Sequence, residues 1–168
     1  WLIGPVASLH ALNSVSIQQR PHPDGGLAPV DASDVSLVQA SLQWQGRPEL
    51  PVPAQVCLSS VSRNGRGFCL DITGSDGSLM LSSSNQKDYV HGFELQHAAL
   101  GESFRSVPAD DDLAFDQTWS DGRIAPVARV LGWWAQSIRS GKPMIPGLAE
   151  GVQSRDACDQ TEGPLAHV

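Results

Sequence analysis

The sequence predicts an α+β fold: a single large, mostly antiparallel (mixed) open sheet with helices packed on one face. Three observations predict it. Hydrophobic residues alternate with a period of two in several segments before Val107. After Val107 the spacing of hydrophobic residues becomes that of a helix. The predicted strands therefore precede the predicted helices. Strands followed by helices are typical of α+β domains rather than of parallel α/β folds. A chain of 168 residues is long enough to bury the core of one domain.

The first two predicted strands are separated by a loop. A strand-like pattern covers residues 6–19, interrupted by Asn13, where a bulge or bend is expected. Residues 20–34 hold three prolines and two glycines and predict a loop. Residues 35–44 alternate cleanly and predict a half-buried antiparallel strand. The inward positions of this strand are Val38, Ala40, Leu42 and Trp44, and the outward ones are Leu37, Gln39, Ser41 and Gln43.

The middle of the chain predicts a meander of short strands. Residues 55–62, 68–73 and 78–82 are joined by two short glycine-bearing turns. In the first turn, Asn64-Gly65 favours positive φ angles. Two weaker strands are predicted near residues 92–97 and 103–107.

Two helices are predicted near the end of the chain. Val127, Leu131, Trp134 and Ile138 recur every three or four residues and form one stripe of a helix. Pro126 is tolerated in its first turn, Arg139 suits the C-terminal end of the dipole, and Gly141 followed by Pro143 ends the helix. A second helix is predicted from Leu148 to about Asp159.

Composition excludes several classes of protein. The 18 acidic residues against 11 basic ones give a net charge of −7, which argues against binding nucleic acid. No apolar stretch approaches the ~20 residues of a membrane span. Three cysteines, an odd number, favour a reducing compartment, and we expect a cytoplasmic location. Cys57 and Cys69 are expected as unbridged thiols on strands paired across the Asn64-Gly65 turn, and Cys158 is expected in the core.

Catalytic and metal-binding motifs are missing from the sequence. It has no nucleophile elbow, no glycine-rich dinucleotide fingerprint and no phosphate-binding loop. His91 and His97 would be ~20 Å apart along one strand, at about 3.3 Å per residue, too far to share a metal ion. Asp110-Asp111-Asp112 lacks the spacing of a calcium loop and predicts a solvated acidic loop. We therefore predict no catalytic residue, no cofactor-binding residue and no metal ligand in this chain.

The first residues suggest that the chain is a fragment. Trp1-Leu2-Ile3 is apolar and is followed at once by Gly4-Pro5, a pairing that ends helices. We interpret Trp1-Leu2-Ile3 as the last turn of a helix that begins upstream; a trimmed tag or propeptide is the alternative.

The order of elements resembles a known family. The motifs that carry the resemblance are Gly4-Pro5-Val6 before the first strand, Asp34-Val35 through Trp44-Gln45-Gly46, the pattern Ile-x-Gly-x-x-Gly-x-Leu at residues 72–79, and Trp134 to Pro143 followed by Pro146 and Gly151. Together they resemble, over nearly the whole chain, the C-terminal domain of the Gfo/Idh/MocA oxidoreductases, relatives of glucose–fructose oxidoreductase and inositol dehydrogenase. The proline-rich loops and residues 160–163 depart from the family pattern.

The resemblance implies the organisation of the parent protein. Residues 1–168 would be a C-terminal domain for substrate binding and oligomerisation, and an N-terminal Rossmann domain, absent from this chain, would bind NAD or NADP. The parent would be an oxidoreductase of a sugar, polyol or related compound, and this chain alone would be inactive. The open sheet face would pair with another subunit, helped by apolar Leu37, Val61 and Met80.

The resemblance also suggests where the substrate would lie. The segment before the last long helix approaches the substrate in this family, which makes Trp119 and Arg123 substrate-side candidates. Structural roles, an apolar anchor and a charge at the start of the helix, are the alternative for both residues.

Two other classes of function compete with the enzyme. One is a non-catalytic sensor or corepressor-like protein built on the same fold, which the sequence upstream of this chain would distinguish. The other is a β-rich carbohydrate-binding module. Such modules expose aromatic platforms, whereas Trp133 and Trp134 fall on a predicted helix and Trp44 at an inward strand position.

Overall fold

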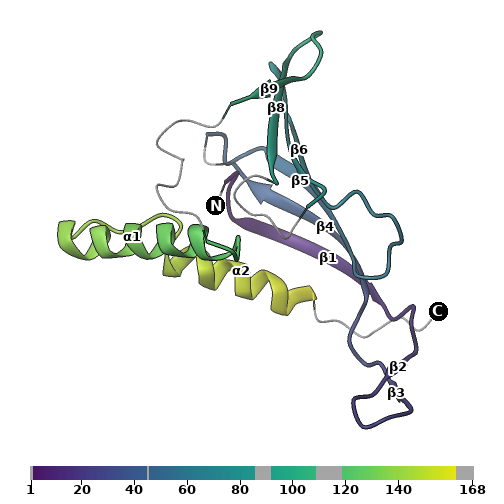
Figure 1. The fold of residues 1–168 in the computed structure, drawn as a ribbon. Coiled ribbons are helices and arrows are strands. Elements are labelled where there is room, and N and C mark those ends of the chain that lie inside the picture. The colour runs from purple at the N-terminus through teal and green to yellow at the C-terminus, as the bar shows by residue number, and fades with distance from the viewer. Residues whose placement is uncertain (1, 45, 86–91, 109–118, 162–168) are drawn as a thin grey trace. The chain divides into compact units, whose positions relative to one another are not determined.

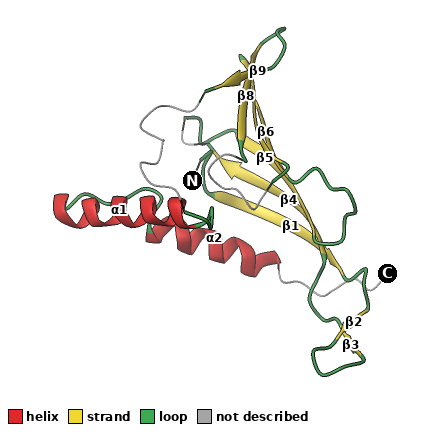
Figure 2. Ribbon diagram, viewed as in Figure 1, coloured by secondary structure: helices red, strands yellow, loops and turns green. Residues whose placement is uncertain are grey.

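The fold is α+β, as predicted, in a computed structural model that describes residues 2–44, 46–85, 92–108 and 119–161 (Figures 1 and 2). The chain divides into two compact units. Unit 1 comprises Trp1–Arg63 and Ile145–Val168, and unit 2 comprises Asn64–Met144. None of the described helices is long and apolar enough to cross a membrane.

Unit 1 holds a three-stranded antiparallel sheet in the order β1-β4-β5. Its strands are β1 (Val6–Ser14), β4 (Val35–Gln43) and β5 (Pro51–Ser59). A separate antiparallel pair, β2 (Gln19–Pro21) with β3 (Leu27–Pro29), lies within the segment predicted to be a loop. That prediction was therefore wrong in part. A short strand tolerates proline where no neighbour needs its missing N–H.

The alternation predicted for β4 is confirmed. Val38, Ala40 and Leu42 are half-buried, whereas Leu37 and Gln39 on the opposite face are exposed. The pairing register places Leu12 and Cys57 on either side of Leu37. Trp44 was wrongly predicted to point inward: it follows the end of β4 and its surface is 47% exposed. The irregular pairing in β1 falls between Val6 and Ser8 rather than at Asn13.

Asp34 joins β1 and β4 at one end of this sheet. Its carboxylate is 2% exposed and accepts hydrogen bonds from the backbone N–H groups of Ser16, at 2.8 Å, and Ile17, at 2.9 Å. The Arg20 guanidinium lies 3.8 Å from the same carboxylate. The hydrogen bond from the Ser16 N–H is the main cause that lowers the pKa of Asp34. The ionised side chain therefore fixes the path of the chain as it leaves β1.

Unit 2 holds a four-stranded antiparallel meander, β6-β7-β8-β9. Its strands are β6 (Phe68–Thr73), β7 (Gly77–Ser83), β8 (Glu94–Ala99) and β9 (Arg105–Val107). Asn64, before β6, has a φ of 54°, which confirms the positive φ predicted for the Asn-Gly turn. One face of the sheet carries two rows of residues that lie opposite one another across the strands: Ile72, Leu79, His97 and Arg105 in one row, and Leu70, Leu81, Leu95 and Val107 in the other.

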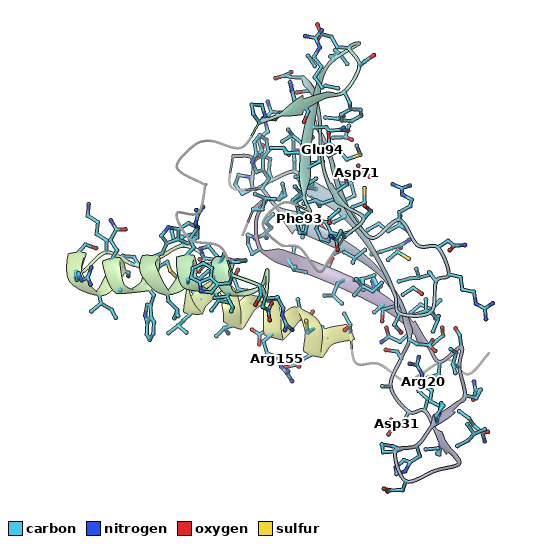
Figure 3. The ribbon with its side chains drawn as sticks, in the orientation of Figure 1. Arg20, Asp31, Asp71, Phe93, Glu94 and Arg155 are labelled. Atoms are coloured by element: carbon cyan, nitrogen blue, oxygen red, sulfur yellow. The ribbon has the colours of Figure 1, made fainter. Side chains whose placement is uncertain are left out.

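The other face of the β6–β9 sheet is mostly polar. Asp71, Met80 and Gln96 lie opposite one another on this face, and so do Ser82 and Glu94. Asp71 and Glu94 are labelled in Figure 3, which draws the side chains of the described residues. In the β1-β4-β5 sheet and in the β6–β9 sheet, one face is therefore more apolar than the other.

Both helices lie where they were predicted. Helix α1 (Ile124–Ser140) ends at Gly141, which has the left-handed conformation (φ 66°) that a glycine cap requires. Its predicted stripe is largely exposed: Val127 57%, Leu131 53%, Trp134 57% and Ile138 67%. Helix α2 (Leu148–Thr161) lies beside β1 within unit 1 (Figure 1), where the Asn13 side-chain amide donates to the carbonyl of Thr161.

Four further details of the predicted fold differ from the structure. The described strands form three hydrogen-bonded sheets, not one. Strands β5 and β6 do not pair across the Asn64-Gly65 turn, so Cys57 and Cys69 lie in different sheets; both thiols are free. Cys158 is exposed rather than in the core, because α2 has no apolar stripe to bury. Of the helical turn expected at residues 1–3, Trp1 lies outside the described residues, and Leu2 and Ile3 are not helical.

Candidate functional site

The candidate substrate-side residues lie in the segment that leads into α1, within unit 2. Trp119 is half-buried, and Arg123 is the residue that immediately precedes the helix. A turn from Asp121 to Ile124 starts the helix: the Ile124 N–H donates to the carbonyl of Asp121 at 3.1 Å. This turn holds Arg123, and Trp119 lies two residues before it.

Arg123 and Asp121 form a two-pronged ion pair. The Arg123 guanidinium donates from Nε to Oδ1 of Asp121 at 2.9 Å and from Nη2 to Oδ2 at 2.7 Å. Oδ1 also accepts the backbone N–H of Arg123 at 3.0 Å. Because the carboxylate binds both the backbone and the side chain of Arg123, it fixes the direction in which the guanidinium leaves the helix.

The charges of this pair persist over the whole physiological range. Side-chain hydrogen bonds from Arg123 are the main cause that lowers the pKa of Asp121 to about 2. A guanidinium does not lose its proton in proteins. Neither group can therefore act as a general acid or base near neutral pH, which requires a pKa close to the working pH. The pair is neutral overall, and what it can supply is a guanidinium held in one direction, on a side chain that is 73% exposed.

The three apolar residues expected on the open sheet face lie on different elements. Leu37 is 39% exposed on the polar face of the unit 1 sheet. Val61 follows the end of β5 and is half-buried. Met80 is half-buried on the polar face of the unit 2 sheet, opposite Asp71 and Gln96. Met80 thus has polar neighbours on its face, whereas Leu37 lies between Leu12 and Cys57.

The remaining predicted candidates for metal binding are histidines and a run of aspartates. His97 lies on β8, whereas His91 and the run Asp110-Asp111-Asp112 lie outside the described residues. Across residues 2–44, 46–85, 92–108 and 119–161, no three His, Cys, Asp or Glu side chains gather as a metal site would require.

The contacts of Asp121 in the candidate site, and those of Asp34 in the unit 1 sheet, were not predicted from the sequence. Asp121 was missed although its position, two residues before the arginine at the start of the helix, is a common place for a carboxylate that binds free N–H groups. Asp34 was missed because the signal is tertiary: its two donors lie in residues 16 and 17, beyond the intervening hairpin.

Comparison with known proteins gives one relative in sequence. The chain is 41% identical over 164 residues to an uncharacterized oxidoreductase of Synechocystis sp.. The match covers 96% of this chain but only 43% of that protein, so the chain spans less than half the length of its relative. No protein-family model matches the chain.

Solved structures share the fold. Levoglucosan dehydrogenase in complex with NADH matches with a TM-score of 0.65 at 18% identity, and its complex with NADH and L-sorbose matches with 0.62 at 17%. Each match covers 89% of this chain and 40% of the dehydrogenase. The sequence relative is thus an oxidoreductase, and the solved dehydrogenase structures share the fold of this chain.

Proposed function

We propose that this chain is the C-terminal domain, residues 1–168, of an NAD(P)-dependent oxidoreductase that acts on a sugar, polyol or related compound. The observation that carries the proposal is the fold shared with a dehydrogenase whose complex contains NADH and L-sorbose. The oxidoreductase relative in Synechocystis supports the same class of reaction. In this proposal the domain shapes the substrate side of the site and pairs with another subunit.

The cofactor is assigned to a Rossmann domain elsewhere in the parent, because the described residues do not fit it. A dinucleotide pyrophosphate is held at a glycine-rich turn that leads from a strand into a helix. The glycine-rich turn here, residues 74–77, joins two antiparallel strands instead. NAD or NADP would supply the hydride acceptor of the reaction, and we propose that the other domain holds it.

Arg123 is proposed to orient the substrate, together with Trp119. A fixed guanidinium is a good hydrogen-bond donor to hydroxyl and carboxylate oxygens, and Asp121 holds it in one direction. The half-buried Trp119 would offer an apolar surface to the carbon side of a sugar-like molecule.

The test uses the parent protein with its upstream domain. In the variant Arg123→Ala, we expect the KM for the parent's sugar or polyol substrate to rise about tenfold, the effect of losing roughly one charged hydrogen bond. Arg47→Ala removes the same charge from a turn in unit 1 and should leave KM unchanged. Equal KM values for the two variants would show that Arg123 only supports the start of α1.

Three further experiments test the roles proposed for this chain and for the parent. The 168-residue chain alone should produce no NADH or NADPH from a panel of sugars and polyols, and turnover by this chain would contradict the proposal. Failure of the whole parent to turn over any of them, while it still binds one, would instead favour the sensor hypothesis. In the parent, Leu37→Glu should weaken subunit pairing, measured by light scattering.

The location is part of the same proposal. We propose a cytoplasmic parent, which the three free thiols Cys57, Cys69 and Cys158 support because a reducing compartment keeps such thiols unbridged.

A further inference from the structure

The connection between β5 and β6 contains the single Asn-Gly sequence of the chain, Asn64-Gly65. Residues 62–67 are all exposed, and Asn64 is the first residue of unit 2. The proposed function gives this turn no role. The side-chain carbonyl carbon of an asparagine can be attacked by the backbone nitrogen of the residue that follows it. The contacts of Asn64 and Gly65 therefore decide whether this reaction is open to the chain.

The turn is anchored on either side of the pair. Before it, the backbone N–H groups of Val61 and Ser62 donate to the Ser59 hydroxyl at 3.3 Å and 3.1 Å. After it, Nη2 of Arg66 lies 3.5 Å from the sulfur of Cys69. The fold thus holds the flanks of the turn through these contacts.

The two reacting groups are left free by the fold. Among the described residues, none forms a hydrogen bond with the side-chain amide of Asn64 or with the backbone N–H of Gly65. The amide can therefore rotate toward the Gly65 nitrogen, and solvent can reach the N–H to remove its proton. Gly65 has no side chain to crowd a ring formed by the two residues. The turn thus meets the steric and the solvent requirements of the reaction.

The other two asparagines of the chain are restrained. Asn13 lies in β1, where its side-chain amide donates to the Thr161 carbonyl and its Oδ1 atom is buried. The backbone N–H of Asn85 donates to the Ser83 hydroxyl at 3.2 Å, and the next residue in the sequence, Gln86, carries a side chain. Asn64 therefore differs from both in its contacts and in the residue that follows it.

We propose that Asn64 is a modification site at which the chain deamidates through a succinimide. The deprotonated Gly65 nitrogen bonds to Cγ of Asn64, and the side-chain nitrogen leaves as ammonia. Water then opens the ring. Addition at Cγ breaks its bond to nitrogen and gives aspartate, whereas addition at the main-chain carbonyl carbon breaks the original peptide bond and gives isoaspartate. Water is the only co-reactant, and no group is oxidised or reduced.

Either product changes the turn. A carboxylate appears between Arg63 and Arg66 and adds one negative charge to the net charge of −7. Isoaspartate also lengthens the main chain by one carbon at the first residue of unit 2 and leaves the former main-chain carbonyl as a free carboxylate. This carboxylate is the group that an L-isoaspartate O-methyltransferase esterifies. The partner class that follows from the chemistry is thus a methyltransferase of this kind.

The experiment is an incubation of the 168-residue chain at neutral and at mildly alkaline pH, with peptide mapping by mass spectrometry at intervals. We expect acid products at Asn64 well before any appear at Asn13 or Asn85. The rate should rise with pH because the Gly65 nitrogen must lose its proton. The isoaspartate fraction is measured with purified L-isoaspartate O-methyltransferase and S-adenosylmethionine labelled in the methyl group, and Asn64→Gln should abolish that labelling.

A pair of alanine variants tests the role of Gly65. Gly65→Ala should slow the reaction at Asn64 about tenfold, equivalent to about 1.4 kcal/mol in the barrier, because the added methyl group crowds the ring. The matched control Gly101→Ala makes the same change in another exposed turn of unit 2 and should leave the rate at Asn64 unaltered. Equal rates in the two variants would overturn the proposal.

Three other outcomes would also overturn it. The first is conversion of Asn13 or Asn85 before Asn64 in the folded chain. The second is aspartate without isoaspartate, which would indicate direct hydrolysis of the amide rather than a succinimide. The third is a clear acceleration at Asn64 in urea, which would show that the folded turn restrains the pair. Similar rates at Asn64 in the folded and the unfolded chain would support the proposal.

Discussion

The backbone at Gly67, just before β6, lies close to the end of β7, and this close approach allows a specific test of the structure of unit 2. Gly67 has a φ of +80°, and a Cβ atom there would lie 2.1 Å from the carbonyl oxygen of Ser83, at the end of β7. Gly101 has nearly the same φ, +79°, but a Cβ atom there meets nothing within 4 Å. The variants Gly67→Ala and Gly101→Ala therefore share the backbone strain and differ only in the steric clash.

The expected losses of stability follow from these two contributions. Alanine at such a φ costs about 1–2 kcal/mol, partly offset by the ~0.4–1 kcal/mol gained because alanine restricts the unfolded chain. Gly101→Ala should thus cost about 1 kcal/mol. The clash at Gly67 requires the backbone to move and should add roughly 1–3 kcal/mol, the range found for overpacked sites. At about 2–4 °C per kcal/mol, the Tm of Gly67→Ala should fall by roughly 4–15 °C, against ~2–4 °C for Gly101→Ala.

Amide hydrogen exchange locates the effect. In Gly67→Ala, the amides of β6 and β7 should exchange faster, while those of β4 in unit 1 serve as an internal reference. Equal Tm values for the two alanine variants, together with unchanged exchange in β6 and β7, would refute the close approach of residue 67 to Ser83.

Three further predictions concern the other polar contacts. Asn13→Ala should lower the local stability of α2 by about 1 kcal/mol, the typical value of one hydrogen bond. Asn13→Asp should lower it further, because a carboxylate then faces the carbonyl of Thr161. The exchange rates of the α2 amides measure both effects. Carboxyl NMR should show Asp121 titrating at about 2. Its pairing with Arg123 therefore stabilises the fold above the ordinary pKa of 3.8, and this stabilisation is lost as the pH falls toward 2. In Arg123→Ala, the pKa of Asp121 should return toward 3.8. Because the pKa of Asp34 is also lowered, Asp34→Asn should reduce the Tm at neutral pH, and the difference from the unaltered chain should shrink as the pH falls below 3.8.

Local patterns in the sequence predicted the elements well, and the pairing between them less well. The limits of β6 and of α1 follow from the alternation at residues 68–73 and from Gly141, both of which are local signals. The Asn64-Gly65 turn was equally clear, and Asn64 does have a positive φ, yet β5 and β6 do not pair. A turn motif sets the local backbone, whereas strand pairing depends on contacts far apart in the sequence. The short β2–β3 pair was hidden by the prolines that usually mark loops.

The same limit applies to the candidate site. The family resemblance suggested Arg123 as a substrate-side residue, but its partner Asp121 changes what the residue can do. With the pKa of Asp121 near 2 and a guanidinium that stays protonated, both members keep their charge near neutral pH. The proposed contribution of this chain is therefore orientation of a substrate. Proton transfer and hydride transfer then fall to groups with a pKa nearer the working pH and to the cofactor, which the proposal assigns to the other domain of the parent.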